Sequence, residues 1–422
     1  MVELAIDGGI PVRETMLHGG FHGSADIDTA EREAVDNVLD KRRLFRFLAN
    51  GEEQSEAARI EGWYSRRLGR RRCLAVNGGT SALIAAMFGV DAGPGDEVII
   101  PAYTFVATAA AVIASGAVPV LCEIDASLNM DPADLEKKIT CHTKAIVPVH
   151  MRGVQARIDA IMEVADRHGI AVVEDVAQAN GGSFGGKPLG TFGLVGCYSF
   201  QQYKIITSGE GGLVATDDEM VYQRALMQHD CAARFWESTK GGESPCVISG
   251  ENYRLSELAA ALVWGQRERL DRIIGHCRGI KGHVIEGIGD IPGLTLQDVP
   301  DPGGDCGITL SFMLPDAQTA QRFGEALRAE NIGCGTVYDN TIPDRHIYAN
   351  WPFMTSGLAE DRRAPWKSPF YEGDVRGYAA DACPRTLELL GRTVMMAIDQ
   401  SFAPEDADDI VLAVNKVADA LL

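Results

Sequence analysis

Short apolar runs of strand length alternate with helical patterns between residues 73 and 217. Apolar residues recur at helical spacing over residues 158–165, for example, and Gly169 is placed to end that helix. Such alternation is typical of an α/β domain with a largely parallel sheet. We predict its strands at residues 97–100, 118–122, 145–149, 171–173, 196–200 and 212–215.

The pattern changes toward the C-terminus. Residues 252–280 carry an apolar stripe at helical spacing and predict one long helix that could bridge two domains. Beyond it, Gly- and Pro-rich segments flank a short strand at 308–313 and a helix at 317–330, which is typical of a smaller α+β domain. We therefore expect an N-terminal arm and large domain at residues 1–275 and a small C-terminal domain at residues 276–422.

Charge and composition narrow the function classes. The 422 residues carry a net charge of −20, and 46% of them are hydrophobic, as in an ordinary globular protein. An acidic chain repels nucleic-acid backbones, so the basic cluster at residues 66–72 is expected to be a solvated helix end rather than a nucleic-acid patch. The chain shows neither a signal-peptide pattern at its start nor an apolar run long enough to cross a membrane. We expect a cytoplasmic protein that binds neither nucleic acid nor membrane.

The cysteines give no sign of a disulfide framework or a metal site. The ten cysteines are at positions 73, 122, 141, 197, 231, 246, 277, 306, 334 and 383, and none forms a Cys-x-x-Cys pair. The histidines show no ligand spacing either. This pattern favours reduced thiols, and no metal is expected.

A first candidate for chemistry is the segment NGGTSAL at residues 77–83, which ends an apolar run and opens a helix. Its glycines and hydroxyls could donate hydrogen bonds to a phosphate at the helix N-terminus. An ordinary helix cap with a glycine turn has the same sequence pattern and remains the alternative. A dinucleotide is disfavoured, because no Gly-x-Gly-x-x-Gly follows the first strand of this unit.

Two further segments place ionisable residues at predicted strand ends. Asp175, in VVEDVAQ at residues 172–178, follows a buried strand at the edge where open α/β sheets bind ligands. Its carboxylate could hold a heterocyclic nitrogen protonated, as pyridoxal phosphate (PLP) requires, or it could cap a helix. Lys204 lies in a polar turn between two strands, within GCYSFQQYKIITSGEGG at residues 196–212. A lysine held at a sheet edge can become a nucleophile, whereas most lysines are solvated surface groups.

These segments occur in order and spacing with GDEVIIP at 95–101, TFVAT at 104–108, KAIVPVHMRG at 144–153, EDVAQANG at 174–181 and NYR at 252–254. The series resembles the DegT/StrS type of sugar aminotransferase, strongly over residues 5–280 and more weakly beyond. The resemblance implies a PLP enzyme of fold type I: an α/β protein whose large domain holds a mixed, mostly parallel seven-stranded sheet, with a smaller C-terminal α+β domain. It also implies a homodimer with active sites at the subunit interface.

The resemblance assigns roles around the cofactor ring. Lys204 matches the lysine that binds PLP as a Schiff base, and Asp175 matches the partner of the pyridine nitrogen. Gln178 matches the residue beside the phenolic oxygen of the cofactor. Phe105 matches the aromatic residue that stacks on the pyridine ring, with a core phenylalanine as the alternative. Relatives with histidine in place of the lysine act as sugar dehydratases, and Lys204 argues against that activity.

The resemblance also assigns the phosphate contacts. Gly79, Thr80 and Ser199 match residues that bind the phosphate within one subunit. Asn252 resembles the asparagine that reaches the phosphate of the neighbouring subunit. The implied activity is a ping-pong transfer of an amino group from L-glutamate or L-glutamine to a keto or aldehyde sugar or to a cyclitol.

Two finer resemblances point to different acceptors. The segments at 150–153, 299–305 and 310–315 resemble enzymes that aminate position 8 of a 3,8-dideoxy-octulosonate, whereas DGGIPVR at residues 7–13 resembles cyclitol and antibiotic-sugar aminotransferases. The octulosonate-like reading is slightly favoured. His150 and Arg152 are the candidate substrate contacts, and Arg152 is the candidate for an acidic acceptor, with a surface arginine as the alternative.

Three other functions remain open. A PLP-dependent dehydratase or aromatising synthase on the same scaffold would release an aromatic product without net consumption of amino donor. A non-catalytic PLP-binding regulator is disfavoured by the presence of both Lys204 and Asp175 and by the lack of a basic DNA-reading element. A purely structural α/β protein would bind no PLP.

Overall fold

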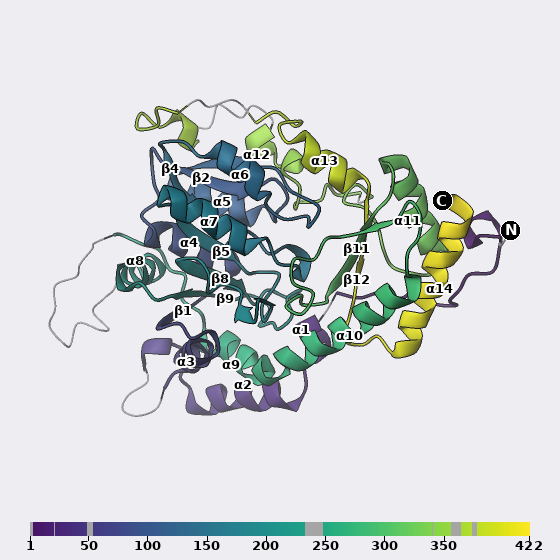
Figure 1. The fold of residues 1–422 in the computed structure, drawn as a ribbon. Helices are drawn as coiled ribbons and strands as arrows, with labels where there is room; N and C mark the ends of the chain where they lie inside the picture. Colours follow the sequence, from purple (N-terminus) through teal and green to yellow (C-terminus); the bar gives the residue numbers. More distant parts are fainter. Residues whose placement is uncertain are drawn as a thin grey trace.

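A single mixed sheet organises the part of the protein that precedes helix α10 (Leu270–Ile288; Figure 1). The computed structural model describes residues 3–20, 22–48, 54–232, 248–339, 341–355, 364–373 and 378–422. The sheet has seven strands in the order β1-β9-β8-β5-β4-β2-β3. β9 is antiparallel to both of its neighbours and the other adjacent pairs are parallel, which confirms the expected mixed, mostly parallel sheet. The strands are β1 (Arg72–Val76), β2 (Glu97–Pro101), β3 (Val118–Cys122), β4 (Thr143–Ile146), β5 (Ala171–Asp175), β8 (Val195–Ser199) and β9 (Gly212–Thr216).

The predicted strands are present, with differences at their ends. β4 ends at Ile146 rather than at residue 149, because Pro148 has no N–H to donate to a ladder. Its chain nevertheless continues beside β5, where the N–H of His150 donates to the carbonyl of Asp175 at 3.0 Å. The sequence marks β1 only as an apolar run, and its pairing with β9 makes it an edge strand of the sheet.

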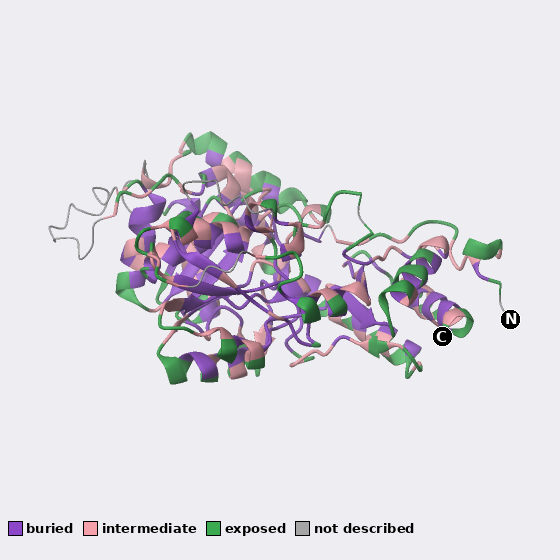
Figure 2. Cartoon of the chain, turned by 90° about the horizontal axis from the view of Figure 1, so that it is seen from above, coloured by how far each residue is buried: buried purple, intermediate pink, exposed green. Residues whose placement is uncertain are grey.

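Helices cover both faces of the sheet, because successive strand residues point to opposite sides. Ile100 belongs to the core under α4, α5 and α8, whereas Ile99 belongs to the core under α6 and α7. Under the β1-β9-β8 end, α3, α9 and α10 cover the second face. Figure 2 shows buried strands between helices with exposed outer faces. The helices up to β9 and directly after it are α1 (His22–Ala25), α2 (Thr29–Lys41), α3 (Glu56–Leu68), α4 (Gly79–Gly89), α5 (Ala107–Ser115), α6 (Pro132–Lys138), α7 (Ile158–His168) and α8 (Glu219–His229).

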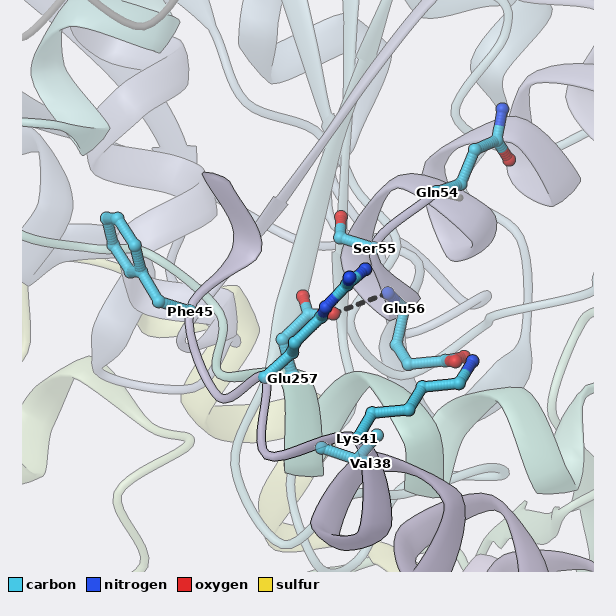
Figure 3. Close-up of a pocket in the computed structure, with 8 residues that line it drawn as sticks. Val38, Lys41, Phe45, Gln54, Ser55, Glu56 and Glu257 are labelled. Atoms are coloured by element: carbon cyan, nitrogen blue, oxygen red, sulfur yellow. Dashed lines mark hydrogen bonds between the residues drawn. The ribbon is translucent and has the colours of Figure 1, made fainter. Parts of the chain in front are cut away.

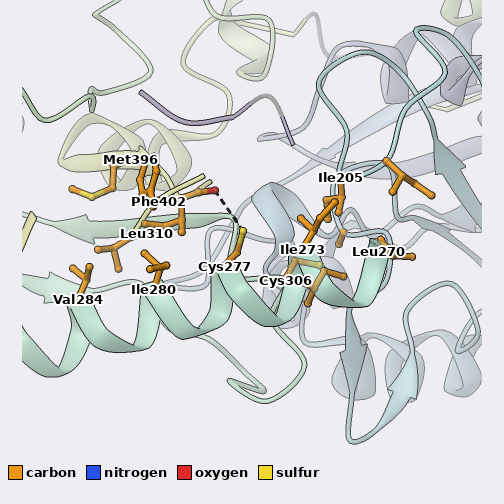
Figure 4. Close-up of a cluster of buried hydrophobic side chains, with 14 of the residues drawn as sticks. Ile205, Leu270, Ile273, Cys277, Ile280, Val284, Cys306, Leu310, Met396 and Phe402 are labelled. Carbon is orange, nitrogen blue, oxygen red and sulfur yellow. Dashed lines mark hydrogen bonds between the residues drawn. The ribbon is translucent and has the colours of Figure 1, made fainter. Parts of the chain in front are cut away.

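The single long helix predicted at residues 252–280 is wrong. Ser256 caps a first helix, α9 (Glu257–Gln266), and a 3-10 turn separates it from α10 (Leu270–Ile288). The apolar stripe of α10 packs on both parts of the chain, with Ile273 near Ile205 and Val284 near Met396 in one continuous cluster (Figure 4). The predicted domain boundary near residue 275 therefore falls inside α10, and the division into two domains stays a prediction.

The C-terminal part is built on a small antiparallel sheet in the order β10-β11-β12. The predicted short strand and following helix are present as β11 and α11. The N-terminal segment also packs here, because the buried Glu330 accepts the backbone N–H groups of Ala5 and Val12 at 2.9 Å each. The elements are β10 (Thr295–Leu296), β11 (Thr309–Met313), β12 (Thr393–Ala397), α11 (Ala317–Ala329), α12 (Pro352–Thr355), α13 (Pro384–Gly391) and α14 (Pro404–Leu421).

A short hairpin lies between β5 and β8 in the chain. β6 (Ser183–Phe184) and β7 (Lys187–Pro188) pair through a turn in which both glycines have positive φ.

The nine cysteines within the described residues carry free thiols, and Cys246 lies outside those residues. None of the helices built from the described residues is long and apolar enough to cross a membrane.

Candidate active site

The predicted site residues follow five different strands at one edge of the sheet. β1, β2, β4, β5 and β8 are mutually parallel in direction, so their carboxyl ends lie together. Ligands of open α/β sheets bind at this edge because the strand ends leave loops and helix N-termini there. The edge carries Gly79 and Thr80 after β1, Phe105 after β2, His150 and Arg152 after β4, Asp175 and Gln178 at the end of β5, and Ser199 and Lys204 at the end of β8.

Asp175 is the last residue of β5, and its side chain is held from two sides. Its Oδ1 accepts the N–H of Ala177 at 3.0 Å, and its Oδ2 accepts the hydroxyl of Thr108 at 3.0 Å. Burial raises the pKa of Asp175, and these two hydrogen bonds together with the amine of Lys204 oppose that rise. A buried carboxylate with a fixed direction is suited to hold a proton on a ring nitrogen.

Glu174, the neighbouring carboxylate, points to the other side of β5. Its Oε1 accepts the N–H groups of Phe192 and Gly193 at 2.7 Å each, and its Oε2 accepts the N–H of Gly190 at 2.8 Å. The ring of His150 lies 3.2 Å from Oε2 as a fourth partner. Both carboxylate oxygens of Glu174 thus bind N–H groups of the loop before β8. Asp175 is therefore the carboxylate of this segment that faces the sheet edge.

Lys204 lies in the turn after β8, between the exposed Tyr203 and the buried Ile205. The turn is anchored by its backbone, because the N–H of Lys204 donates to Gln201 and its carbonyl accepts from Gly23 in α1. Burial lowers the pKa of Lys204 below its usual value, with Asp175 raising it and Arg152 lowering it. A larger fraction of the amine is therefore neutral, which is the form that attacks a carbonyl.

The N-terminus of α4 forms a backbone cradle. Its N-cap is Gly78, which contributes no side-chain hydrogen bond to the first turn. A Cβ placed on Gly79 would lie 2.8 Å from the Cβ of Ser199, so the absence of a side chain allows β8 and α4 to approach closely. Thr80 is exposed in this first turn. Free N–H groups at a helix start, with hydroxyls beside them, suit a phosphate.

Asn252 is exposed beside this cradle, on a segment that follows residues outside the described ranges. It forms an isolated bridge with Asp230, and its side chain accepts the N–H of Arg254 at 3.3 Å. The next residue, Tyr253, accepts the N–H of Asn77 at 2.7 Å, which ties the segment to the end of β1. Its predicted contact with a neighbouring subunit stays a prediction.

Phe105 and Gln178 follow β2 and β5 at the same sheet edge as Asp175 and Lys204. Phe105 is 44% exposed, which is unusual for a core phenylalanine, and its ring centroid lies 5.3 Å from that of His346. Gln178 accepts the backbone N–H of Arg152 at 3.1 Å, which links the loops after β5 and β4. An exposed ring at the sheet edge is free to stack on a planar cofactor.

The two candidate substrate contacts differ in their surroundings. His150 is fully buried: its Nδ1 accepts the N–H of Ala156 at 3.1 Å, so its ring proton lies on Nε2 and donates to Glu174. A substrate contact would require one of these bonds to break, and that role of His150 stays a prediction. Arg152 has a positive φ of 55° and a side chain that is one-third exposed, which fits a residue that reaches into the site.

Arg152 contacts two residues that sequence reasoning missed, and a third contacts one of these two. Its Nε donates to the hydroxyl of Tyr103 at 3.1 Å, and its guanidinium lies 3.8 Å from Asp344. Asp344 also accepts from the ring of His346 at 2.7 Å, and burial lowers the pKa of His346. Tyr103 adjoins the TFVAT segment and could have been noticed there, whereas nothing in the sequence placed Asp344 or His346 beside Arg152.

Two cavities among the described residues lie away from this edge. One, of about 20 Å³, lies where Glu257 accepts the N–H of Glu56 at the start of α3 (Figure 3). The other, of about 520 Å³, lies between α10 and residues 296–311. Neither is lined by a predicted site residue. The donor set at the sheet edge, with a buried carboxylate, a partly neutral lysine and a glycine cradle, is what fits PLP.

The chain is similar to known proteins over most of its length. The model of the DegT/DnrJ/EryC1/StrS aminotransferase family matches residues 25–360. L-glutamine:scyllo-inosose aminotransferase of Streptomyces griseus is 34% identical over 364 residues, which cover 83% of this chain and 83% of that protein. DesV of S. venezuelae has a TM-score of 0.74 and 26% identity, with 92% of this chain and 94% of DesV covered. 3-Amino-5-hydroxybenzoic acid synthase has a TM-score of 0.76 and 24% identity, with 96% and 99% covered, which shows a shared fold.

Proposed function

The chain belongs to the DegT/DnrJ/EryC1/StrS aminotransferase family and is a PLP-dependent aminotransferase, and we propose that it moves an amino group from L-glutamine or L-glutamate to a keto-cyclitol. The donor and the cyclitol are supported by the name of the Streptomyces griseus relative. The octulosonate acceptor, slightly favoured by short sequence matches, becomes the second candidate.

The observation that carries the proposal is that the carboxylate of Asp175 and the amine of Lys204 lie at the same sheet edge, close enough that each shifts the pKa of the other. PLP, when bound, would carry the amino group from the donor to the acceptor, and its ring would act as an electron sink. Asp175 would hold a proton on the ring nitrogen, and the Nζ of Lys204 would carry a proton between substrate carbon and cofactor. Gly79, Thr80 and Ser199 would bind the phosphate, with Phe105 against the ring and Gln178 beside its oxygen.

The acceptor preference rests on the surroundings of Arg152. Asp344 already compensates its charge at 3.8 Å, so an acidic acceptor would have to compete with a carboxylate inside the protein. Hydroxyl groups could instead donate to Asp344 and accept from Arg152. This geometry supports a neutral polyhydroxylated acceptor over a sugar acid.

The test is an amination assay of the PLP-loaded protein with L-glutamine and either a keto-cyclitol or an 8-oxo octulosonate. We expect the amino-cyclitol and the 2-oxo acid of the donor to form in equal amounts, as measured by mass spectrometry. Amination of the octulosonate alone would overturn the choice of acceptor. Arg152→Ala should raise the KM for the acceptor. Arg322→Ala, at an exposed position, is the matched control and should leave that KM unchanged.

The same assay separates the rival functions. An aromatising synthase would release an aromatic product without consuming L-glutamine. A PLP-binding regulator would bind the cofactor and show neither product. The shared fold with 3-amino-5-hydroxybenzoic acid synthase shows that the scaffold alone does not select the reaction.

A homodimer with shared active sites is part of the proposal. Leu39 and Leu44 near the N-terminus and Tyr203 beside Lys204 are half or more exposed, and a second copy could cover them. Light scattering should give twice the mass of the 45.4 kDa chain.

Mixing two inactive variants tests whether Asn252 acts across the interface. A hybrid dimer contains one Lys204→Ala subunit and one Asn252→Ala subunit. If Asn252 acts across the interface, one of its two sites combines the intact Lys204 of one chain with the intact Asn252 of the other. Activity of the mixture above that of either variant is expected if Asn252 serves the partner's phosphate. Unchanged low activity would mean that Asn252 acts within its own chain.

Location in the cytoplasm is also proposed. The nine free thiols among the described residues support a reducing compartment. Fractionation of the source cells followed by detection of the protein would test this location.

A further inference from the structure

Two buried threonine hydroxyls lie behind Asp175 in a continuous chain. Thr104 follows β2 and Thr108 lies in the first turn of α5, and their side-chain oxygens are 2.7 Å apart. The hydroxyl of Thr108 in turn lies 3.0 Å from Oδ2 of Asp175. All three residues are almost completely buried, so water does not compete for these hydrogen bonds.

The chain has a preferred direction because each hydroxyl has one proton. With Asp175 ionised, Thr104 donates to Thr108 and Thr108 donates to Asp175, and both distances lie within the range of a hydrogen bond. With Asp175 protonated on Oδ2, the order reverses, and the proton of Thr104 must find another acceptor. The carbonyl of Phe105 is 3.5 Å away, at the limit of a hydrogen bond. The chain therefore favours the ionised carboxylate.

Backbone contacts keep the hydroxyl chain in place. The N–H of Thr104 donates to the carbonyl of His346 at 2.8 Å, and the N–H of Val106 donates to that of Arg345 at 3.0 Å. The turn that carries Thr104 and Phe105 is thus fastened to a segment near the C-terminal part.

We propose that Thr108, ordered by Thr104, is a positioning residue that keeps Asp175 ionised and aimed at the ring nitrogen of the cofactor. This inference rests on the proposed role of Asp175. The other ionisable groups that act on this carboxylate are Lys204 from the turn after β8 and His150 from the loop after β4, whose ring itself bonds to Glu174. Burial works against ionisation, and the hydroxyl of Thr108 counters it from inside the protein.

The first test titrates Asp175 in the full chain without cofactor, by ¹³C NMR of labelled aspartate. Thr108→Val keeps the shape of the side chain but removes the donor, so the pKa of Asp175 should rise by about one unit, a ten-fold change. Thr108→Ser keeps the hydroxyl and should leave the pKa unchanged. Thr104→Val, which removes only the second link, should give a smaller rise and remains informative if Thr108→Val does not fold.

The second test uses PLP labelled with ¹⁵N at the ring nitrogen in the loaded protein. We expect a protonated ring in the wild type and in Thr108→Ser, and a shift toward the unprotonated ring in Thr108→Val as the shared proton moves to Asp175. Equal Asp175 titration in the valine and serine variants would overturn the role of Thr108 even if PLP binds. If the wild type does not bind PLP, the proposed function is wrong, and the first test still reports on the hydroxyl chain.

Discussion

Replacing Glu174 with glutamine removes one acceptor oxygen from a fully buried site without changing its volume. One carboxylate oxygen accepts the N–H groups of residues 192–193, and the other accepts those of Gly190 and the His150 ring. A glutamine has a single acceptor oxygen, so whichever way its amide turns, its NH₂ faces two donors. His150 cannot relieve the conflict by moving its proton, because its Nδ1 accepts the N–H of Ala156.

The magnitude follows from the two donors that lose their acceptor. Hydrogen bonds to a charged group contribute about 1.5–3 kcal/mol each, so we expect a loss of about 3–6 kcal/mol in the free energy of unfolding. Unfolding entropy scales with chain length, and for 422 residues this loss corresponds to a decrease in Tm of about 3–7 °C. Such a loss is a large part of the stability of an ordinary protein.

The assay is thermal unfolding of Glu174→Gln and wild type at equal protein concentration, without cofactor. Glu163→Gln on the exposed face of α7 is the matched control and should change the free energy of unfolding by less than about 0.5 kcal/mol. A Glu174→Gln protein as stable as this control would refute the account of Glu174 as the acceptor that holds the loop before β8.

Four further outcomes are expected. Borohydride reduction of the PLP-loaded protein, followed by peptide mapping, should place the pyridoxyl group on Lys204, and a label on any other lysine would contradict the assignment. Asp175→Asn should fold, as judged by circular dichroism, yet lose most turnover, because an amide cannot hold the ring proton. Gly79→Ala should weaken PLP binding at least ten-fold by equilibrium titration, since its Cβ would meet Ser199 at 2.8 Å, whereas Gly279→Ala in open space should not. Burial lowers the pKa of His229 to about 3, so the unfolded chain binds one more proton between pH 6.5 and 3. Stability should therefore fall by up to about 1.4 kcal/mol per pH unit as the pH drops through that window, and His229→Gln should flatten this slope in acid-unfolding curves.

The sequence by itself determined the alternation of strands and helices and the residues that follow the strands. Apolar runs bounded by polar turns encode strands locally, and the order of the motifs carried the family resemblance with Lys204 and Asp175 in it. The break between α9 and α10 was not readable, because the apolar stripe continues across the turn at residues 267–269. Gln266, the last residue of α9, accepts the N–H of Thr207 at 2.8 Å, a tertiary contact that periodicity does not report.

Only the tertiary structure decided which side chains meet at the sheet edge. Glu174 and Asp175 are adjacent carboxylates in the sequence, and their opposite roles follow from the side of β5 to which each one points. Asp344 and His346 come from a segment far along the chain, and their approach to Arg152 depends on how the C-terminal part packs on the sheet. Such contacts are set by the free energy of burying many distant residues together, and no local pattern records them.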